Sequence, residues 1–308
     1  MDDEFNSLIT NNTWTLTSLP EGRKALGGRW VYTLKRGPKG EIARYKARWV
    51  VRGFEQREGL DYNKTFASVV KPMSYKAMFT IAAAIDWDLE QMDVKTAFLY
   101  RDVEEEIFVE QPEGFVRGEA KVCRLNKALY GLKQSPRVWY NTFASFLNAE
   151  LGVVPLEADS SVFINPKDGT LIALYVDDVL ITGPSKEAIQ KVKDALNRRF
   201  YMTDLGACCY YLGMTVTRNR QQRTLRLGQE AYIEKVLRDF GLWECKEIAT
   251  PMETTCHLGK APDGFQANAQ DRLLYQKAVG SLMYAMLGTR PDIVSVVSRY
   301  GANPTQAH

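Results

Sequence analysis

The sequence predicts an α+β fold. A strand-rich arm comes first, strands and helices around a central sheet follow, and the last third of the chain reads as helical. The chain has 308 residues, of which 45% are hydrophobic and 25% charged, which is typical of one large globular domain or two to three subdomains. It contains neither a Gly-rich phosphate loop nor a G-x-S-x-G elbow.

The first half of the chain supplies the arm and the first part of the sheet. Residues 29–35 and 43–51 alternate like strands around a Pro-Gly turn at 36–41, which predicts a basic hairpin. Residues 73–87 read as a helix, and residues 89–100 as a short apolar strand that carries Asp93. Residues 107–115 predict another strand, and residues 135–151 a helix with Pro136 in its first turn. Its apolar stripe is Trp139, Phe143, Phe146 and Leu147.

The second half continues with three strand-like runs between residues 160 and 183. Asn165–Gly169 divides the first two runs, and the pair Asp177–Asp178 divides the last two. Ser185 is placed to cap a helix whose stripe is Ile189, Val192, Leu196 and Phe200. A hairpin is predicted over 210–228, a helix over 229–240 that Gly241 ends, an exposed linker over 250–270, and a last helix over 271–288.

Composition excludes some classes of protein. No apolar run reaches membrane-spanning length and the first thirty residues lack a signal-peptide pattern, so we expect no membrane partner. The five cysteines form no CxxC pair and the chain has only two histidines, so we expect no zinc site. We expect the protein to reside in a reducing compartment.

Charge is distributed unevenly although the net charge is only +3. Eleven basic residues lie between Arg23 and Arg57, and ten acidic residues between Asp86 and Glu113. A basic arm beside an acidic centre suits a protein that holds a polyanion and divalent cations. Taken alone, however, the charge pattern favours two solvated faces of opposite sign.

The stretch "LIALYVDDVLITG" places Asp177 and Asp178 inside an apolar run, and "QMDVKTAF" does the same with Asp93. An ordinary Asp turn would explain the pair. Against that reading, neither Gly, Asn nor Pro accompanies it, and charges so close to a core are usually paired or bound to metal. If the two strands are neighbours, these acids could supply oxygen ligands to two Mg²⁺ ions for in-line phosphoryl transfer.

Many ordered segments together resemble the reverse transcriptase region of a copia-type retrotransposon Pol polyprotein. They are "GGRWVYTLKRGPKGEIARYKARWVVRGFEQREGLDYNKTFASVVKP", "QMDVKTAFL", "EEEIFVEQPEGF", "CRLNKALYGLKQSPRVWY", "DSSVF", "LYVDDVLITG", "DLGACCYYLGM", "GQEAYIEKVL", "TPM" and "VGSLMYAMLGTRPDI". The resemblance covers nearly the whole chain. It implies an RNA-directed DNA polymerase with the right-hand fold of fingers, palm and thumb, whose antiparallel palm sheet is flanked by helices.

The resemblance also implies roles for individual residues. Asp93, Asp177 and Asp178 match the catalytic acids, which would bind two Mg²⁺ or Mn²⁺ ions, with Asp178 the weaker ligand. The expected dNTP contacts are Lys46, Arg48, Phe98 and Gln134, with Phe98 as an aromatic gate against a ribose 2′-hydroxyl. Tyr175, Ser135 and Pro136 are the expected primer and template contacts.

By the same resemblance, residues 1–24 are a lead-in and 25–92 are fingers with the basic hairpin. The palm is 93–215, with part of the fingers at 115–140, and the thumb with a partial connection is 216–308. The expected partners are a primed RNA or DNA template, dNTPs and other parts of the Pol polyprotein. The expected location is the cytoplasm, in a virus-like particle if the element is intact, with the nucleus as the alternative. We expect the chain to stop before an RNase H domain.

This sequence departs from the family pattern at several positions. Tyr100 and Arg101 stand where the family usually has Asn or His followed by Gly, and Arg101 would add strain if that Gly serves a left-handed turn. Thr203 replaces a frequent Lys, and Ala67 or Ser68 a frequent Pro. The alternative hypothesis is therefore a truncated, inactive retrotransposon remnant that at most binds nucleic acid. A host protein that recruited the domain as a binding module has no supporting feature.

Overall fold

The computed structural model describes residues 1–36, 42–118, 120–252 and 268–301. They form two compact units, one made of Met1–Met78 with Trp87–Ala207, the other of Phe79–Asp86 with the chain from Cys208 onward. Both contain helices and antiparallel strand pairs, so the α+β prediction is confirmed. Helix α2 (Pro72–Ala84) contributes residues to both units. Within the described ranges, none of the helices has the length and apolar character needed to cross a membrane.

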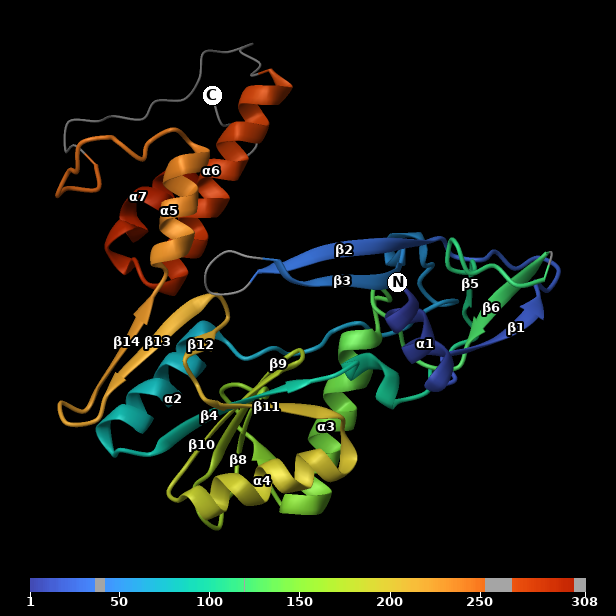
Figure 1. The fold of residues 1–308 in the computed structure, drawn as a ribbon, viewed down its shortest axis with the longest axis horizontal. Helices are drawn as coiled ribbons and strands as arrows, with labels where there is room; N and C mark the ends of the chain where they lie inside the picture. The colour runs from blue at the N-terminus through green and yellow to red at the C-terminus, as the bar shows by residue number, and fades with distance from the viewer. Residues whose placement is uncertain (37–41, 119, 253–267, 302–308) are drawn as a thin grey trace. The chain divides into compact units, whose positions relative to one another are not determined.

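The centre of the first unit is a six-stranded antiparallel sheet with the order β11-β4-β10-β9-β8-β7. The strands are β4 (Asp88–Val94), β7 (Val154–Pro155), β8 (Val162–Ile164), β9 (Leu171–Tyr175), β10 (Asp178–Gly183) and β11 (Met202–Ala207). Helices α3 (Ser135–Leu151) and α4 (Lys186–Arg199) lie on the same side of this sheet (Figure 1). The three strand runs expected between residues 160 and 183 are therefore confirmed as β8, β9 and β10.

The predicted stripes of the two helices pack into one hydrophobic core with alternate residues of the sheet. Trp139, Phe143 and Leu147 come from α3, and Ile189, Val192 and Leu196 from α4. From β4 and β10 the core takes Met92, Val94, Val179 and Ile181. Because successive side chains of a strand point to opposite faces, Asp93 and Asp178 point away from these helices.

Helix α4 begins as the sequence predicts. The side chain of Ser185 accepts a hydrogen bond of 3.1 Å from the backbone N–H of Ala188, which satisfies one of the free donors of the first turn. On its buried side, Lys193 is ion-paired with Glu90 of β4 and with Asp204 of β11, at 2.8 Å from the latter. Helix α4 is thus tied by charge as well as by apolar packing to two strands of the sheet.

The N-terminal part of the first unit surrounds a second core. Helix α1 (Asp2–Thr10) precedes a small sheet with the order β1-β6-β5, made of β1 (Trp14–Ser18), β6 (Lys121–Leu125) and β5 (Phe108–Val109). Leu8 of α1 shares this core with Trp49, Val51 and Leu129. Residues 1–24, expected as a lead-in, therefore include a helix and a strand that pack into the unit.

The predicted basic hairpin is confirmed as β2 (Gly28–Arg36) paired with β3 (Ile42–Val51). Its turn at 37–41 lies outside the described residues. Short 3₁₀ helices follow β3 at Gly53–Glu55 (η1) and β4 at Ala97–Tyr100 (η2).

The second unit contains a three-stranded sheet and helices. Its strands are β12 (Tyr210–Tyr211), β13 (Met214–Asn219) and β14 (Thr224–Gly228), and its further helices are α5 (Glu230–Asp239), α6 (Ala269–Gly288), η3 (Pro291–Ile293) and α7 (Val294–Gly301). The predicted hairpin and the predicted helices over 229–240 and 271–288 are confirmed. Gly241 ends α5 with φ +68°. Of the predicted linker, residues 253–267 lie outside the described part of the chain.

Candidate active site

The two adjacent acids lie at the tip of the β9–β10 hairpin. Tyr175 and Asp178 face each other in register, so the turn consists of Val176 and Asp177. The sequence predicted that both acids would divide the strands, but Asp178 is the first residue of β10. Val176 has a φ of +57°, a left-handed conformation that is costly for a β-branched residue. Such strain is often found where a backbone must present a functional side chain, here that of Asp177.

Strand β4 brings Asp93 to the same place, as the expectation of neighbouring strands requires. Asp93 is the register partner of Asp178, and the backbone N–H of Val94 donates a 2.8 Å hydrogen bond to the carbonyl oxygen of Asp177. Asp93 and Asp177 line one cavity of about 430 Å³. Asp178 does not line it, and its carboxylate accepts a 3.1 Å hydrogen bond from Gln91.

Both cavity acids have a cationic neighbour. The guanidinium Nη2 of Arg48 lies 3.8 Å from Asp177 Oδ2, and Lys95 Nζ lies 3.3 Å from Asp93 Oδ2. Burial raises the pKa of Asp177 above its ordinary value, and the nearby Asp93 carboxylate adds to the rise, while Arg48 and Lys46 oppose it. Besides Asp93 and Asp177, the lining contains the carboxylates of Asp3 and Glu4 from α1 and the cations Lys46, Arg48 and Lys95.

The carboxylates of Asp93 and Asp177 fit a Mg²⁺-type ion whose remaining ligands are water and substrate phosphates. Among the described residues, no group of three or more His, Cys, Asp or Glu side chains is arranged to hold a metal, so the three acids do not form a complete protein cage. Mg²⁺ is commonly bound by one or two carboxylates together with water and substrate phosphates. Asp93 and Asp177 meet that smaller requirement.

The predicted dNTP contacts divide into two groups. Lys46 and Arg48 of β3 line the cavity with the two acids. Phe98 does not: it is buried in the core below, where it meets Tyr130 edge to face with 4.7 Å between ring centroids. Gln134 is also buried, and donates 2.8 Å and 3.2 Å hydrogen bonds to the carbonyl of Asp61 and the carboxylate of Glu105. Neither Phe98 nor Gln134 therefore lines the cavity, although Phe98 contacts the lining residue Tyr130.

The predicted primer and template residues differ in exposure to solvent. Tyr175 is exposed at the end of β9, next to the acid-bearing turn. Ser135 is fully buried and its hydroxyl donates a 2.6 Å hydrogen bond to the carbonyl of Leu129, at the start of α3. Pro136 lies in the first turn of α3, as predicted.

Sequence reasoning missed Tyr130, whose ring forms a wall of the cavity. The guanidinium of Arg48 lies over this ring, 4.7 Å from its centroid. The carbonyl of Tyr130 accepts a 2.8 Å hydrogen bond from the N–H of Val51 in β3. Gly131, with φ +97°, permits this close approach, because a Cβ there would be 2.0 Å from the carbonyl oxygen of Val51. The only local signal was this glycine, which directly follows the tyrosine.

The departures from the family pattern can also be placed. Arg101 has an extended backbone with φ −138°, so the left-handed turn on which the expected strain depended is not present at this residue. The phenol oxygen of Tyr100 accepts a 2.5 Å hydrogen bond from the N–H of Tyr201, and both residues line the cavity. Thr203 of β11 is the register partner of Asp93, so it stands on the strand beside one of the two cavity acids.

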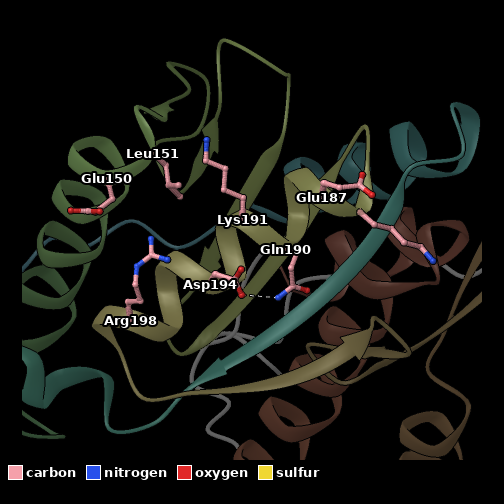
Figure 2. A pocket seen from close by; sticks show the side chains of 8 residues that line it. Glu150, Leu151, Glu187, Gln190, Lys191, Asp194 and Arg198 are labelled. Carbon is pink, nitrogen blue, oxygen red and sulfur yellow. Dashed lines mark hydrogen bonds between the residues drawn. The ribbon is translucent and has the colours of Figure 1, made fainter.

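A second hollow of about 560 Å³ lies elsewhere on the first unit (Figure 2). It is lined by the end of α3 and the outer surface of α4, and acids alternate with bases around it: Glu150, Lys186, Glu187, Lys191, Asp194 and Arg198. None of these residues lines the cavity of Asp93 and Asp177, so the two hollows are separate.

Residues 11–254 match the family described as reverse transcriptase (RNA-dependent DNA polymerase). The retrovirus-related Pol polyprotein from transposon TNT 1-94 of Nicotiana tabacum is 44% identical over all of this chain, which covers 24% of that protein. The corresponding polyprotein from transposon RE2 of Arabidopsis thaliana is 37% identical over the whole chain, which covers 21% of it. The chain thus spans about a quarter or less of the length of these two polyproteins.

Among solved structures, the foamy viral protease-reverse transcriptase in complex with dsDNA aligns with 96% of this chain and 49% of that one. The TM-score is 0.45 and the sequence identity 11%, a likeness too distant to support conclusions about the site. The family match, in contrast, covers most of the chain and confirms the resemblance and the predicted polymerase fold class. With a family match over residues 11–254 and relatives similar along its full length, the chain belongs to the reverse transcriptase (RNA-dependent DNA polymerase) family of copia-type Pol polyproteins.

Proposed function

We propose that this chain is an RNA-directed DNA polymerase domain that transfers a nucleotide from a dNTP to the 3′-hydroxyl of a primer. The observation that supports it most is one cavity that Asp93 of β4 and Asp177 of the β9–β10 turn line together with the cations Lys46 and Arg48. Carboxylates that can hold divalent ions and cations that can hold a triphosphate are the two requirements of nucleotidyl transfer.

In this proposal Asp93 and Asp177 hold two Mg²⁺ or Mn²⁺ ions, and Asp178 supports them from β10. The bound ions would supply activation of the 3′-hydroxyl and stabilisation of the charge on the leaving pyrophosphate. Arg48 and Lys46 bind triphosphate oxygens and neutralise charge that grows in the transition state. Tyr130 orients the Arg48 guanidinium and borders the nucleotide, with Phe98 behind it.

The proposal also covers the primed template, the subdomains and the location of the protein. A primed RNA or DNA template would lie beside Tyr175 and the start of α3, and the basic β2–β3 hairpin would contact its backbone. In this scheme the fingers extend over 25–92, the palm over 93–215 and the thumb over 216–308. Residence in a cytoplasmic particle, together with other parts of a Pol polyprotein, belongs to the proposal as well.

The second candidate is a family member that binds primed template without extending it. Thr203 favours this candidate, because it stands opposite Asp93 where related chains often carry a lysine that could protonate pyrophosphate. A lysine does remain near Asp93, since Lys95 lies 3.3 Å from it. The intact pair of cavity acids is the reason that we place polymerisation first.

Primer extension tests the proposal. The chain is incubated with an RNA template, a DNA primer, dNTPs and either Mg²⁺ or Mn²⁺, beside the Asp177→Ala variant. Extension by the parent and none by the variant supports a polymerase. If neither extends the primer while both are folded and both retain the primed template in a gel-shift assay, the binding-only candidate replaces it.

A further inference from the structure

Helix α1 presents a polar face to the acid cavity. Phe5 and Leu8 anchor the adjoining face: Phe5 stacks on Phe115 with 4.2 Å between ring centroids, and Leu8 is buried in the second core. Glu4, Ser7 and Asn11, spaced by three and four residues, line the cavity. The helix is therefore anchored by its apolar side so that its polar side forms part of the cavity wall.

Glu4 is tied to β3, the strand that carries two of the cavity's cations, Lys46 and Arg48. The backbone N–H of Trp49, the residue after Arg48, donates a hydrogen bond to its carboxylate. Arg48 and Lys46 both lie close enough to act on it electrostatically. Burial outweighs these contacts and raises the pKa of Glu4, so placing the carboxylate here is costly. A costly, well-anchored charge beside a reactive cavity points to a functional role.

Arg48 therefore shares the cavity lining with two carboxylates that act on it, Glu4 and Asp177. Its guanidinium is 3.8 Å from Asp177, which is longer than a direct charge-assisted hydrogen bond, and the Tyr130 ring supports its plane. If the charge of Glu4 were absent, the electrostatic balance would draw Arg48 and Lys46 toward the remaining carboxylates, Asp177 first. A tight Arg48–Asp177 pair would then compete with a divalent ion for the same oxygen atoms.

We propose that Glu4 is a positioning residue that holds Arg48 and Lys46 on the nucleotide side of the cavity and so keeps the Asp177 carboxylate available to a divalent ion. The inference rests on the proposed function, because it assumes that Asp177 binds the ion. It assigns to α1 a role in the chemistry of a site whose metal ligands lie on β4 and the β9–β10 turn.

The test is a Mn²⁺ titration of the whole chain, with free Mn²⁺ measured by electron paramagnetic resonance and without template or dNTP. Glu4→Gln removes the charge but can still accept the hydrogen bond from Trp49. Asp2→Asn is the matched control, since it removes one charge from an exposed residue of the same turn that does not line the cavity. Asp177→Asn identifies which binding belongs to the site, and thermal unfolding verifies that each variant is folded.

We expect Glu4→Gln to weaken the Asp177-dependent Mn²⁺ binding by about 10-fold, the lower end of what partners of metal ligands contribute, and Asp2→Asn to leave it unchanged. In an Arg48→Gln/Lys46→Gln background, Glu4→Gln should have much less effect, because its action passes through these two cations. Unchanged or tighter binding in Glu4→Gln, or an equal loss in both backgrounds, would overturn the inference alone. If the parent shows no Asp177-dependent Mn²⁺ binding, both the inference about Glu4 and the metal-binding part of the proposed function are overturned.

Discussion

The Arg48 guanidinium lies 3.8 Å from the Asp177 carboxylate and over the ring of Tyr130, and all three residues line one cavity. Arg48 belongs to the basic hairpin and Asp177 to the turn of the central sheet, 129 positions later in the chain. This pair joins the part of the molecule that can bind phosphate to the part that can bind a divalent ion. The following predictions test its consequences and those of the packing behind it.

Asp177→Asn should remove primer extension and at the same time stabilise the protein. Burial raises the pKa of Asp177, so its ionised form is disfavoured in the folded state. This cost to the free energy of unfolding is absent below pH 3.8, the ordinary pKa of an Asp side chain. It is complete above the raised pKa that Asp177 has in the folded state. Removing the charge should therefore increase the free energy of unfolding at pH 7 by about 0.5–2 kcal/mol.

Thermal or urea unfolding at pH 7 and again near pH 3 measures this effect. The advantage of the Asn variant should shrink at the lower pH. An Asn variant that is less stable than the parent at pH 7 would contradict the assigned electrostatic cost.

Arg48→Lys should impair nucleotide binding although the charge is retained. Lysine cannot stack on Tyr130 or present a planar fork to a phosphate. We expect KM for dNTP to increase about 10-fold with a smaller change in kcat, as for the loss of one charge-assisted hydrogen bond. Arg52→Lys is the matched control, because Arg52 directly follows the same strand, β3, but pairs with Glu55 and does not line the cavity. Equal effects of the two substitutions on KM would show that Arg48 has no special place.

Gly131→Ala should destabilise the protein and displace Tyr130. The added Cβ would meet the carbonyl oxygen of Val51 at 2.0 Å, in addition to the strain of a positive φ. The expected loss in the free energy of unfolding is about 3 kcal/mol. Gly59→Ala, also at positive φ but with no neighbour within 4 Å, should cost only about 1 kcal/mol. Urea unfolding compares the two, and equal losses would mean that the contact with β3 is not important.

Lys193→Met should destabilise the fold by leaving Glu90 and Asp204 without their buried cation. We expect about 2 kcal/mol, less than for a fully buried pair because the Asp204 side chain is 46% exposed. Lys191→Met, on the exposed surface of the same helix, should change the stability by less than about 0.5 kcal/mol.

The same ion pair predicts a pH dependence. Burial lowers the pKa of Lys193, but hydrogen bonds from its ammonium to Asp204 and Glu90 outweigh burial and raise it overall. Burial raises the pKa of Asp204, but the hydrogen bond from Lys193 outweighs burial and lowers this pKa overall. The stabilisation is therefore complete between pH 3.8 and 10.5, and is lost below and above this window as each folded pKa is passed. Urea unfolding of parent and Lys193→Met at pH 7 and pH 3 should show a difference that narrows in acid, and a constant difference would contradict it.

The sequence by itself determined what depends on neighbours along the chain. Periodic apolar residues such as Trp139, Phe143 and Leu147 placed α3 and its buried face, and the hydroxyl of Ser185 set the start of α4. The acids Asp93 and Asp177 could be singled out because carboxylates inside apolar strands are rare. These features are readable because helix periodicity, capping and strand alternation act over a few residues.

Only the tertiary structure decided which side chains meet in the cavity. It placed Tyr130 in the wall and Gln134 in a buried hydrogen-bond network, although both come from the same short segment. It also brought Glu4 of α1 to Arg48. These contacts join residues far apart in the chain, and their geometry depends on close packing, as at Gly131 against Val51, and on the register of β3, β4 and β10. Because packing and register are set by all the elements together, no local pattern in the sequence could reveal them.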